Sequence, residues 1–154
     1  MWKGRVAAVY IAEAKGMPMQ SVEEARAAAG KGLEGDRYFV KNGNFSKKDR
    51  PDQEVTLVEL EAIEALKCDF GIELEPGGAR RNIVTFGVSL NQLMGHEFRV
   101  GEVILRGIKL CDPCSHLERL SQPGVKKGLT NRGGLRAQII TGGIIRVGDE
   151  IEGA

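Results

Sequence analysis

Glycine divides the apolar part of this sequence into short segments, and this division limits the folds open to the chain. There are 21 glycines in 154 residues, about twice the ~7% that is usual in globular proteins. Short runs rich in β-branched and apolar residues lie between the glycine turns, and such runs are typical of strands. The expected strands cover residues 4–13, 55–58, 80–88, 96–100, 103–110, 135–141, 144–147 and 148–151.

Many short strands joined by glycine turns predict a mostly antiparallel sheet that closes on itself. We therefore expect a mainly β fold with a few short helices, in the form of a closed or partly open β-barrel. We also expect a hairpin that pairs residues 135–141 with 144–147 across Gly142 and Gly143. The length of the chain predicts a single domain over residues 1–154.

Three patterns predict helices. Residues 21–24 read Ser-Val-Glu-Glu, a capping-box spacing that predicts a helix through Ala29. Residues 56–59 read Thr-Leu-Val-Glu, and an apolar stripe follows them, which predicts a helix to about Lys67. A further helical turn is expected from Ser89 to Gly95.

The overall charge and composition restrict the class of partner. The net charge is +1 and aromatic residues make up 5%, so we expect neither nucleic-acid binding nor attraction to a membrane surface. No stretch approaches the ~20 apolar residues of a membrane span, and the N-terminal segment reads as a strand rather than a signal peptide. Three cysteines without a secretion signal favour a reducing, cytoplasmic location.

The motif Cys111-Asp112-Pro113-Cys114 follows the strand expected at 103–110. Residues 115–118 read Ser-His-Leu-Glu, so a helix should begin at Ser115. This places Cys114 just before a helix N-terminus, where the partial positive charge stabilises a thiolate. Cys114 is therefore the better nucleophile or metal ligand of the pair.

Other interpretations of the two cysteines stay open. A structural zinc site needs four ligands, and the other candidates do not form a second closely spaced pair (Cys68, His96 and His116). A thioredoxin-type dithiol has the right local order, although the parallel β-α-β pattern around it is missing. Both cysteines could also be small buried residues. His116 either assists proton transfer beside the thiol or is an inert surface histidine.

Several separated motifs, taken in order, resemble the MOSC domain family, which is named after the C-terminal domain of molybdenum cofactor sulfurase. They are Gly35-Asp36-Arg37-Tyr38, residues 80–85, residues 95–101, Cys111-Asp112-Pro113-Cys114, Arg132-Gly133-Gly134 and residues 145–149. The resemblance covers roughly residues 3–151 and implies a β-barrel-like fold. The family's invariant cysteine, proposed to carry sulfur or to ligate molybdenum, matches Cys114. Tyr38 stands where the family often has histidine.

The resemblance also implies a cofactor, molybdopterin with its terminal phosphate. Arginine binds phosphate through two N–H groups, and glycine allows backbone N–H groups to approach it. The expected binding residues are Asp36, Arg37, Arg80, Arg81, Asn82, Arg132, Gly133 and Gly134. Lys126, Lys127 and Arg136 are further basic residues near the last of these motifs. A solvated basic face is the alternative interpretation, and Asp36 could serve only to brace Arg37.

The leading hypothesis is a molybdenum-cofactor-binding or sulfur-carrier domain in which Cys114 holds a persulfide or ligates molybdenum. It would act as a molybdenum-dependent reductase or a sulfur transferase, with Cys111 either resolving the persulfide as a disulfide or purely structural. The alternatives are a non-enzymatic barrel that binds and delivers molybdopterin, and a dithiol redox protein using Cys111 and Cys114.

The size of the chain also bears on its cofactor and its partners. It leaves no room for a pyridoxal-phosphate desulfurase domain, so that cofactor is not expected. The expected partner is a sulfur donor or a protein of cofactor biosynthesis or delivery, and we also consider a homodimer.

Overall fold

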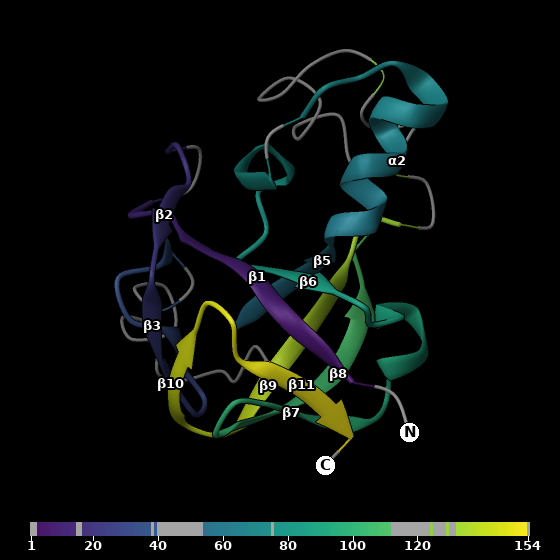
Figure 1. The fold of residues 1–154 in the computed structure, drawn as a ribbon. Coiled ribbons are helices and arrows are strands. Elements are labelled where there is room, and N and C mark those ends of the chain that lie inside the picture. Colours follow the sequence, from purple (N-terminus) through teal and green to yellow (C-terminus); the bar gives the residue numbers. More distant parts are fainter. Residues whose placement is uncertain are drawn as a thin grey trace.

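The computed structural model describes residues 3–14, 17–37, 39, 54–74, 76–111, 124, 129 and 132–153. Seven strands form a closed ring (Figure 1). Around the ring they are β1 (Gly4–Ile11), β11 (Glu150–Gly153), β7 (Glu97–Val100), β8 (Val103–Leu110), β9 (Leu135–Thr141), β5 (Val55–Glu59) and β6 (Ile83–Phe86). β6 pairs with β1 and closes the barrel. β5 and β6 are parallel, and the other neighbours in the ring are antiparallel. The expected mainly β barrel is confirmed.

A second, three-stranded sheet contains β3 (Glu24–Ala28), β10 (Gly143–Arg146) and β4 (Gly32–Leu33), while β2 (Gln20–Val22) extends the main sheet beside β1. The predicted helix over residues 21–29 is therefore wrong. Ala25 and Ala27 are buried whereas Arg26 between them is exposed, which is the period of a strand rather than of a helix. Pairing with β10 on one edge of β3 overrides the local capping pattern.

The predicted hairpin between residues 135–141 and 144–147 is also wrong, although both segments are strands. β9 lies between β8 and β5, and β10 leaves the barrel to pair with β3. A side chain at Gly142 would come within 2.7 Å of the backbone oxygen of Ala27. The close approach of these two backbones carries β10 onto the second sheet.

The main helix, α2 (Leu60–Phe70), confirms the helix predicted after residues 56–59 and extends it to Phe70. It ends at Gly71, whose φ of 68° is left-handed and whose N–H donates to the carbonyl oxygen of Lys67. Thr56 does not cap this helix, because it lies within β5. Two short 3-10 helices, η2 (Pro76–Ala79) and η3 (Leu90–Leu93), complete the regular structure, and η3 confirms the turn expected after Ser89.

Apolar side chains from all the barrel strands fill its interior, and smaller clusters lie beneath α2. In Figure 1, α2 lies beside the upper end of the barrel, whereas β1 begins and β11 ends at the lower end. Among the described residues, no helix combines the length and the apolar character needed to cross a membrane.

The strand register brings four strand ends together. Ile83 at the start of β6 is paired with Val9 near the end of β1 and with Leu57 in β5. Leu57 is in turn paired with Leu135 at the start of β9, which lies opposite Leu110 at the end of β8. Residues that directly follow β1 and β8, or directly precede β6 and β9, therefore meet at one end of the barrel.

Candidate functional site

The barrel end defined by these four strand ends carries several of the expected site residues. Arg81 precedes β6, Gly133 and Gly134 precede β9, and Cys111 follows β8. The Nε–H of Arg81 donates to the carbonyl oxygen of Gly133 over 2.9 Å. The backbone N–H of Cys111 donates to the carbonyl oxygen of Gly134 over 2.8 Å. We call the Arg81–Gly133 pair, together with the neighbouring Arg132, the arginine end of the barrel.

Among the described residues, Arg81 is the most enclosed cation at this end, with 9% of its surface exposed. Its Nε is held by Gly133, but no described residue accepts a hydrogen bond from its Nη1 or Nη2. These two nitrogen atoms carry the paired N–H groups with which guanidinium binds a carboxylate or a phosphate. The guanidinium of Arg81 is therefore held at Nε, whereas its Nη1 and Nη2 have no acceptor among the described residues.

Arg132 lies beside this pair and is exposed. Its backbone N–H donates to the carbonyl oxygen of Leu129 over 2.8 Å, and its side chain contacts no acceptor among the described residues. Gly134 has a φ of 112°, and a β-carbon there would overlap the carbonyl oxygen of Leu57. The close passage of β5 thus explains why residue 134 is glycine.

A second group contains Asp36, Arg37 and Arg80. It is linked to the arginine end because Arg80 directly precedes Arg81. Asp36 is fully buried, and its Oδ1 accepts hydrogen bonds from the backbone N–H of Ala12 at 3.0 Å and from Nη1 of Arg37 at 3.2 Å. Nη2 of Arg37 donates to the carbonyl oxygen of Arg80 over 3.3 Å. Asp36 does brace Arg37, which is one of the two roles that the sequence left open.

Asn82 is also fully buried. Its Oδ1 accepts hydrogen bonds from the backbone N–H and the hydroxyl of Thr56, at 3.0 and 3.1 Å. Its Nδ2 donates to the carbonyl oxygen of Tyr10 over 3.1 Å. Asn82 thus ties the start of β6 to both of its neighbours in the barrel, β5 and β1, directly after Arg81.

The cysteines differ in exposure. Cys111 is buried, with 4% of its surface exposed, whereas Cys68 on α2 is exposed. Cys114 and His116 lie outside the described residues, as do Lys126 and Lys127. Within the described ranges, no group of three or more histidine, cysteine or acidic side chains could hold a metal ion.

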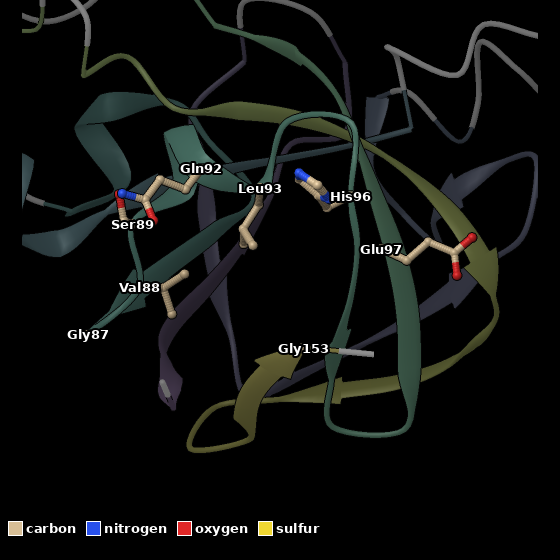
Figure 2. A pocket seen from close by; sticks show the side chains of 8 residues that line it. All are labelled: Gly87, Val88, Ser89, Gln92, Leu93, His96, Glu97 and Gly153. Carbon is tan, nitrogen blue, oxygen red and sulfur yellow. The ribbon is translucent and has the colours of Figure 1, made fainter. Parts of the chain in front are cut away.

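A pocket of about 460 Å³ lies at the other end of β6 from Arg81. Figure 2 shows the residues that line it: Gly87, Val88, Ser89, Gln92, Leu93, His96, Glu97 and Gly153. The carboxylate of Glu97 points away from the other labelled side chains. The lining includes neither arginine nor cysteine, so this pocket is separate from the arginine end.

Two contacts of the second group, made by Arg80 and Arg37, involve methionines that no sequence motif indicated. The carbonyl oxygen of Met17 accepts a hydrogen bond from Nη2 of Arg80 at 2.8 Å. The sulfur of Met19 accepts one from Nη1 of Arg37 at 3.5 Å. Neither methionine belongs to a recognisable motif, and only the fold of the segment after β1 brings them beside these arginines.

Comparison with solved structures finds the same fold in other proteins, among them three from bacteria. The YuaD protein of Bacillus subtilis has a TM-score of 0.81 at 20% identity, covering 99% of this chain and 97% of that one. YiiM of Geobacillus stearothermophilus has a TM-score of 0.75 at 13% identity, covering 98% and 75%. YiiM of Escherichia coli has a TM-score of 0.68 at 20% identity, covering 97% and 69%. At these identities the likeness establishes the fold alone.

The comparison with curated proteins gives no match. The family model described as the MOSC domain matches residues 25–152, which is most of the chain and includes the arginine end of the barrel. The chain therefore belongs to the MOSC domain family, which is associated with binding of the molybdenum cofactor.

Proposed function

We propose that this protein binds the molybdenum cofactor at the arginine end of the barrel and that Cys114 is its reactive thiol. The observation that carries the proposal is the state of the Arg81 guanidinium. It is 9% exposed, yet no described residue accepts a hydrogen bond from its Nη1 or Nη2. A cation this enclosed is costly to remove from water unless an anion pairs with it, and the arrangement therefore supports an anionic ligand.

The donors at this end fit the phosphate of molybdopterin. Nη1 and Nη2 of Arg81 match two phosphate oxygens in a bidentate pair, and Arg132, which directly precedes the Gly133 that Arg81 contacts, supplies a second, exposed guanidinium. When bound, the cofactor supplies the redox chemistry of molybdenum, whereas the protein binds and orients it. Arg81 and Arg132 are accordingly the residues proposed to hold the phosphate.

Cys114 is proposed as the thiolate that either coordinates molybdenum or carries a persulfide. The support is its place in the sequence, three residues after Cys111 at the end of β8 and before the helix expected from Ser115. In the carrier role, the Cys114 thiolate attacks the outer sulfur of a donor persulfide, R–S–SH. A new S–S bond forms on Cys114, the donor's S–S bond breaks, and the donor leaves as a thiolate with no net oxidation.

These two roles of Cys114 correspond to a molybdenum-dependent reductase and a sulfur transferase. The second candidate function is a barrel that binds and delivers molybdopterin without catalysis. The arginine donors favour this delivery function, because they can hold the phosphate of molybdopterin without any thiol. A dithiol redox protein differs from all of these because it requires Cys111 as well as Cys114.

Reconstitution separates these candidates. Each protein is incubated anaerobically with free molybdenum cofactor and passed through gel filtration, and the protein peak is assayed for molybdenum and pterin. The proteins are the wild type, Cys114→Ser, Cys111→Ser and Cys68→Ser, the last as a matched control on the exposed face of α2.

We expect both components to elute with the wild type, Cys111→Ser and Cys68→Ser. Loss of molybdenum only in Cys114→Ser would identify that thiolate as the ligand. Retention of both by Cys114→Ser would favour the carrier or the delivery barrel. Absence of both from the wild-type peak would overturn the proposed cofactor binding.

A further inference from the structure

The backbone at Arg80 adopts a conformation that side chains with a β-carbon rarely take. Its φ is 59°, and among the described residues it is the only one other than glycine with a positive φ. The left-handed region brings the β-carbon close to the following carbonyl oxygen. Such a conformation persists where the surroundings hold it, and it is often found at functional sites. Arg80 directly precedes Arg81.

The contacts that hold Arg80 in this conformation include three hydrogen bonds to other described residues. Its backbone N–H donates to the carbonyl oxygen of Gly77 over 3.1 Å. Its own Nη2 donates to the carbonyl oxygen of Met17 over 2.8 Å. Its carbonyl oxygen accepts from Nη2 of Arg37 over 3.3 Å. The last contact fixes the peptide group that joins Arg80 to Arg81, because that group is planar and moves as one unit.

Arg37 is itself held in place by the buried Asp36 and the partly buried Met19. Its Nη1 donates to Oδ1 of Asp36 over 3.2 Å and to the sulfur of Met19 over 3.5 Å, and its side chain is 11% exposed. Asp36 is fully buried and also accepts from the backbone N–H of Ala12, which follows the end of β1. A continuous path of hydrogen bonds therefore runs from β1 through Asp36 and Arg37 to the peptide group before Arg81.

The chain is also fixed on the other side of Arg81. The backbone N–H of Asn82 donates to the hydroxyl of Thr56 over 3.1 Å, and its carbonyl oxygen accepts from the backbone N–H of Tyr10 over 2.7 Å. Arg81 thus stands between two fixed peptide groups. The direction in which its side chain leaves the backbone is set before any ligand binds, which reduces the entropy lost on binding.

We propose that Asp36 and Arg37 are positioning residues that fix the direction of the Arg81 guanidinium. The guanidinium of Arg37 contacts both Asp36 and the backbone of Arg80, and Arg81 supplies the donors for the anion. The binding part of this inference rests on the proposed function, whereas the positioning part concerns only contacts within the chain. The two parts can therefore fail separately.

Arg37→Lys is the principal variant, because lysine keeps the charge but lacks a planar fork that can reach Asp36 and the carbonyl of Arg80 together. Asp36→Asn is the second variant, since asparagine retains an oxygen for the N–H of Ala12 while weakening the pair with Arg37. Arg146→Lys, at an exposed ion pair with Glu24 3.8 Å away, is the charge-matched control. Ile151→Val, in the buried part of β11, controls for a general loss of stability.

Two quantities are measured on each full-length protein. The first is the rate at which the Nε–H of Arg81 exchanges with solvent, followed by NMR and assigned with Arg81→Lys. The second is the midpoint of a titration with inorganic phosphate, a probe that carries the anionic chemistry of the cofactor's terminus. We expect both variants to raise the exchange rate and the phosphate midpoint about tenfold, the size of losing one hydrogen bond to a charged group. Both controls should stay near wild type.

The outcomes are separable. If the exchange rate is unchanged in both variants while the phosphate midpoint rises, Arg37 contacts the anion itself and the positioning role is overturned. If neither quantity changes, the positioning role is overturned as well. If the wild type binds no phosphate, the exchange rate alone decides the positioning role, and the failure counts against the anion site of the proposed function.

Discussion

Arg81 and Gly133 are 52 positions apart in the sequence, and the Nε–H of Arg81 donates to the carbonyl oxygen of Gly133 over 2.9 Å. This bond joins the segment before β6 to the segment before β9, across the parallel partner strand β5. It uses the one guanidinium nitrogen that is not part of the terminal fork. The same contact that secures the barrel end therefore leaves Nη1 and Nη2 of Arg81 without an acceptor among the described residues.

Replacing Arg132 with glutamine should weaken binding of the cofactor without destabilising the fold. Its side chain is exposed and makes no described contact, so the free energy of unfolding should stay within about 0.5 kcal/mol of wild type. A hydrogen bond to a charged group contributes about 1.5–3 kcal/mol, so the dissociation constant for the cofactor should rise at least about tenfold. Equilibrium titration measures this, with Arg99→Gln, at an exposed ion pair on β7, as the control. If Arg132→Gln and Arg99→Gln bound the cofactor with equal affinity, Arg132 would not be a binding residue.

Gly134→Ala should destabilise the protein more than Gly148→Ala. Both glycines have a positive φ, of 112° and 92°, so both substitutions carry a similar backbone cost of about 1–2 kcal/mol. Only at position 134 would the added carbon overlap a backbone atom, the carbonyl oxygen of Leu57, whereas nothing lies within 4 Å at position 148. Urea denaturation should give Gly134→Ala a free energy of unfolding at least about 2 kcal/mol lower than that of Gly148→Ala. Similar urea midpoints for the two variants would show that β5 can move away from a side chain at position 134.

Asn82→Ala should reduce the free energy of unfolding by about 3 kcal/mol or more. It would remove a buried side chain that accepts two hydrogen bonds from Thr56 and donates one to Tyr10, and the buried backbone groups would lose their partners. Gln92→Ala, at an exposed amide on η3, provides the comparison and should change the free energy by less than about 0.5 kcal/mol. A small effect at Asn82 would mean that water replaces all three contacts.

Alkylation should distinguish the cysteines in the native protein. Cys68 is exposed and should react with iodoacetamide at a rate near that of a free thiol, whereas the buried Cys111 should react at least about tenfold more slowly. Peptide mass spectrometry over a time course measures both rates in one sample. Denaturation should make the two rates equal. Rapid labelling of native Cys111 would show that the end of β8 opens readily.

The strands were predictable because most of them are short apolar runs between glycines, and Val103–Leu110 and Leu135–Thr141 have the expected bounds. The partners of those strands were less predictable. Nothing in the local sequence of residues 143–146 distinguishes pairing with β9 from pairing with β3, because either choice buries Ile145. Thr56 illustrates the same limit: its spacing from Glu59 fits a helix cap, but its hydroxyl bonds to Asn82.

At the candidate site, sequence motifs identified residues whose proximity only the fold could establish. Arg81, Gly133, Gly134 and Cys111 come from three separate motifs, and the register of β5, β6, β8 and β9 brings them to one end. The burial of Asp36 and its bond to Ala12 depend on how the chain returns after β1. The pattern Gly-Asp-Arg does not predict how the chain folds back after β1. The sequence therefore allowed us to propose that Asp36 braces Arg37, but not to decide between this role and direct binding.

Binding of the molybdenum cofactor at the proposed arginine end of the barrel is tested by reconstituting the wild type and the double variant Arg81→Gln, Arg132→Gln anaerobically with free cofactor. Gel filtration follows, and molybdenum and pterin are assayed in the folded protein peak. We expect both components to elute with the wild type and both to be lost from the double variant. Equal retention by the two proteins, with both folded, would show that the cofactor does not bind at the arginine end.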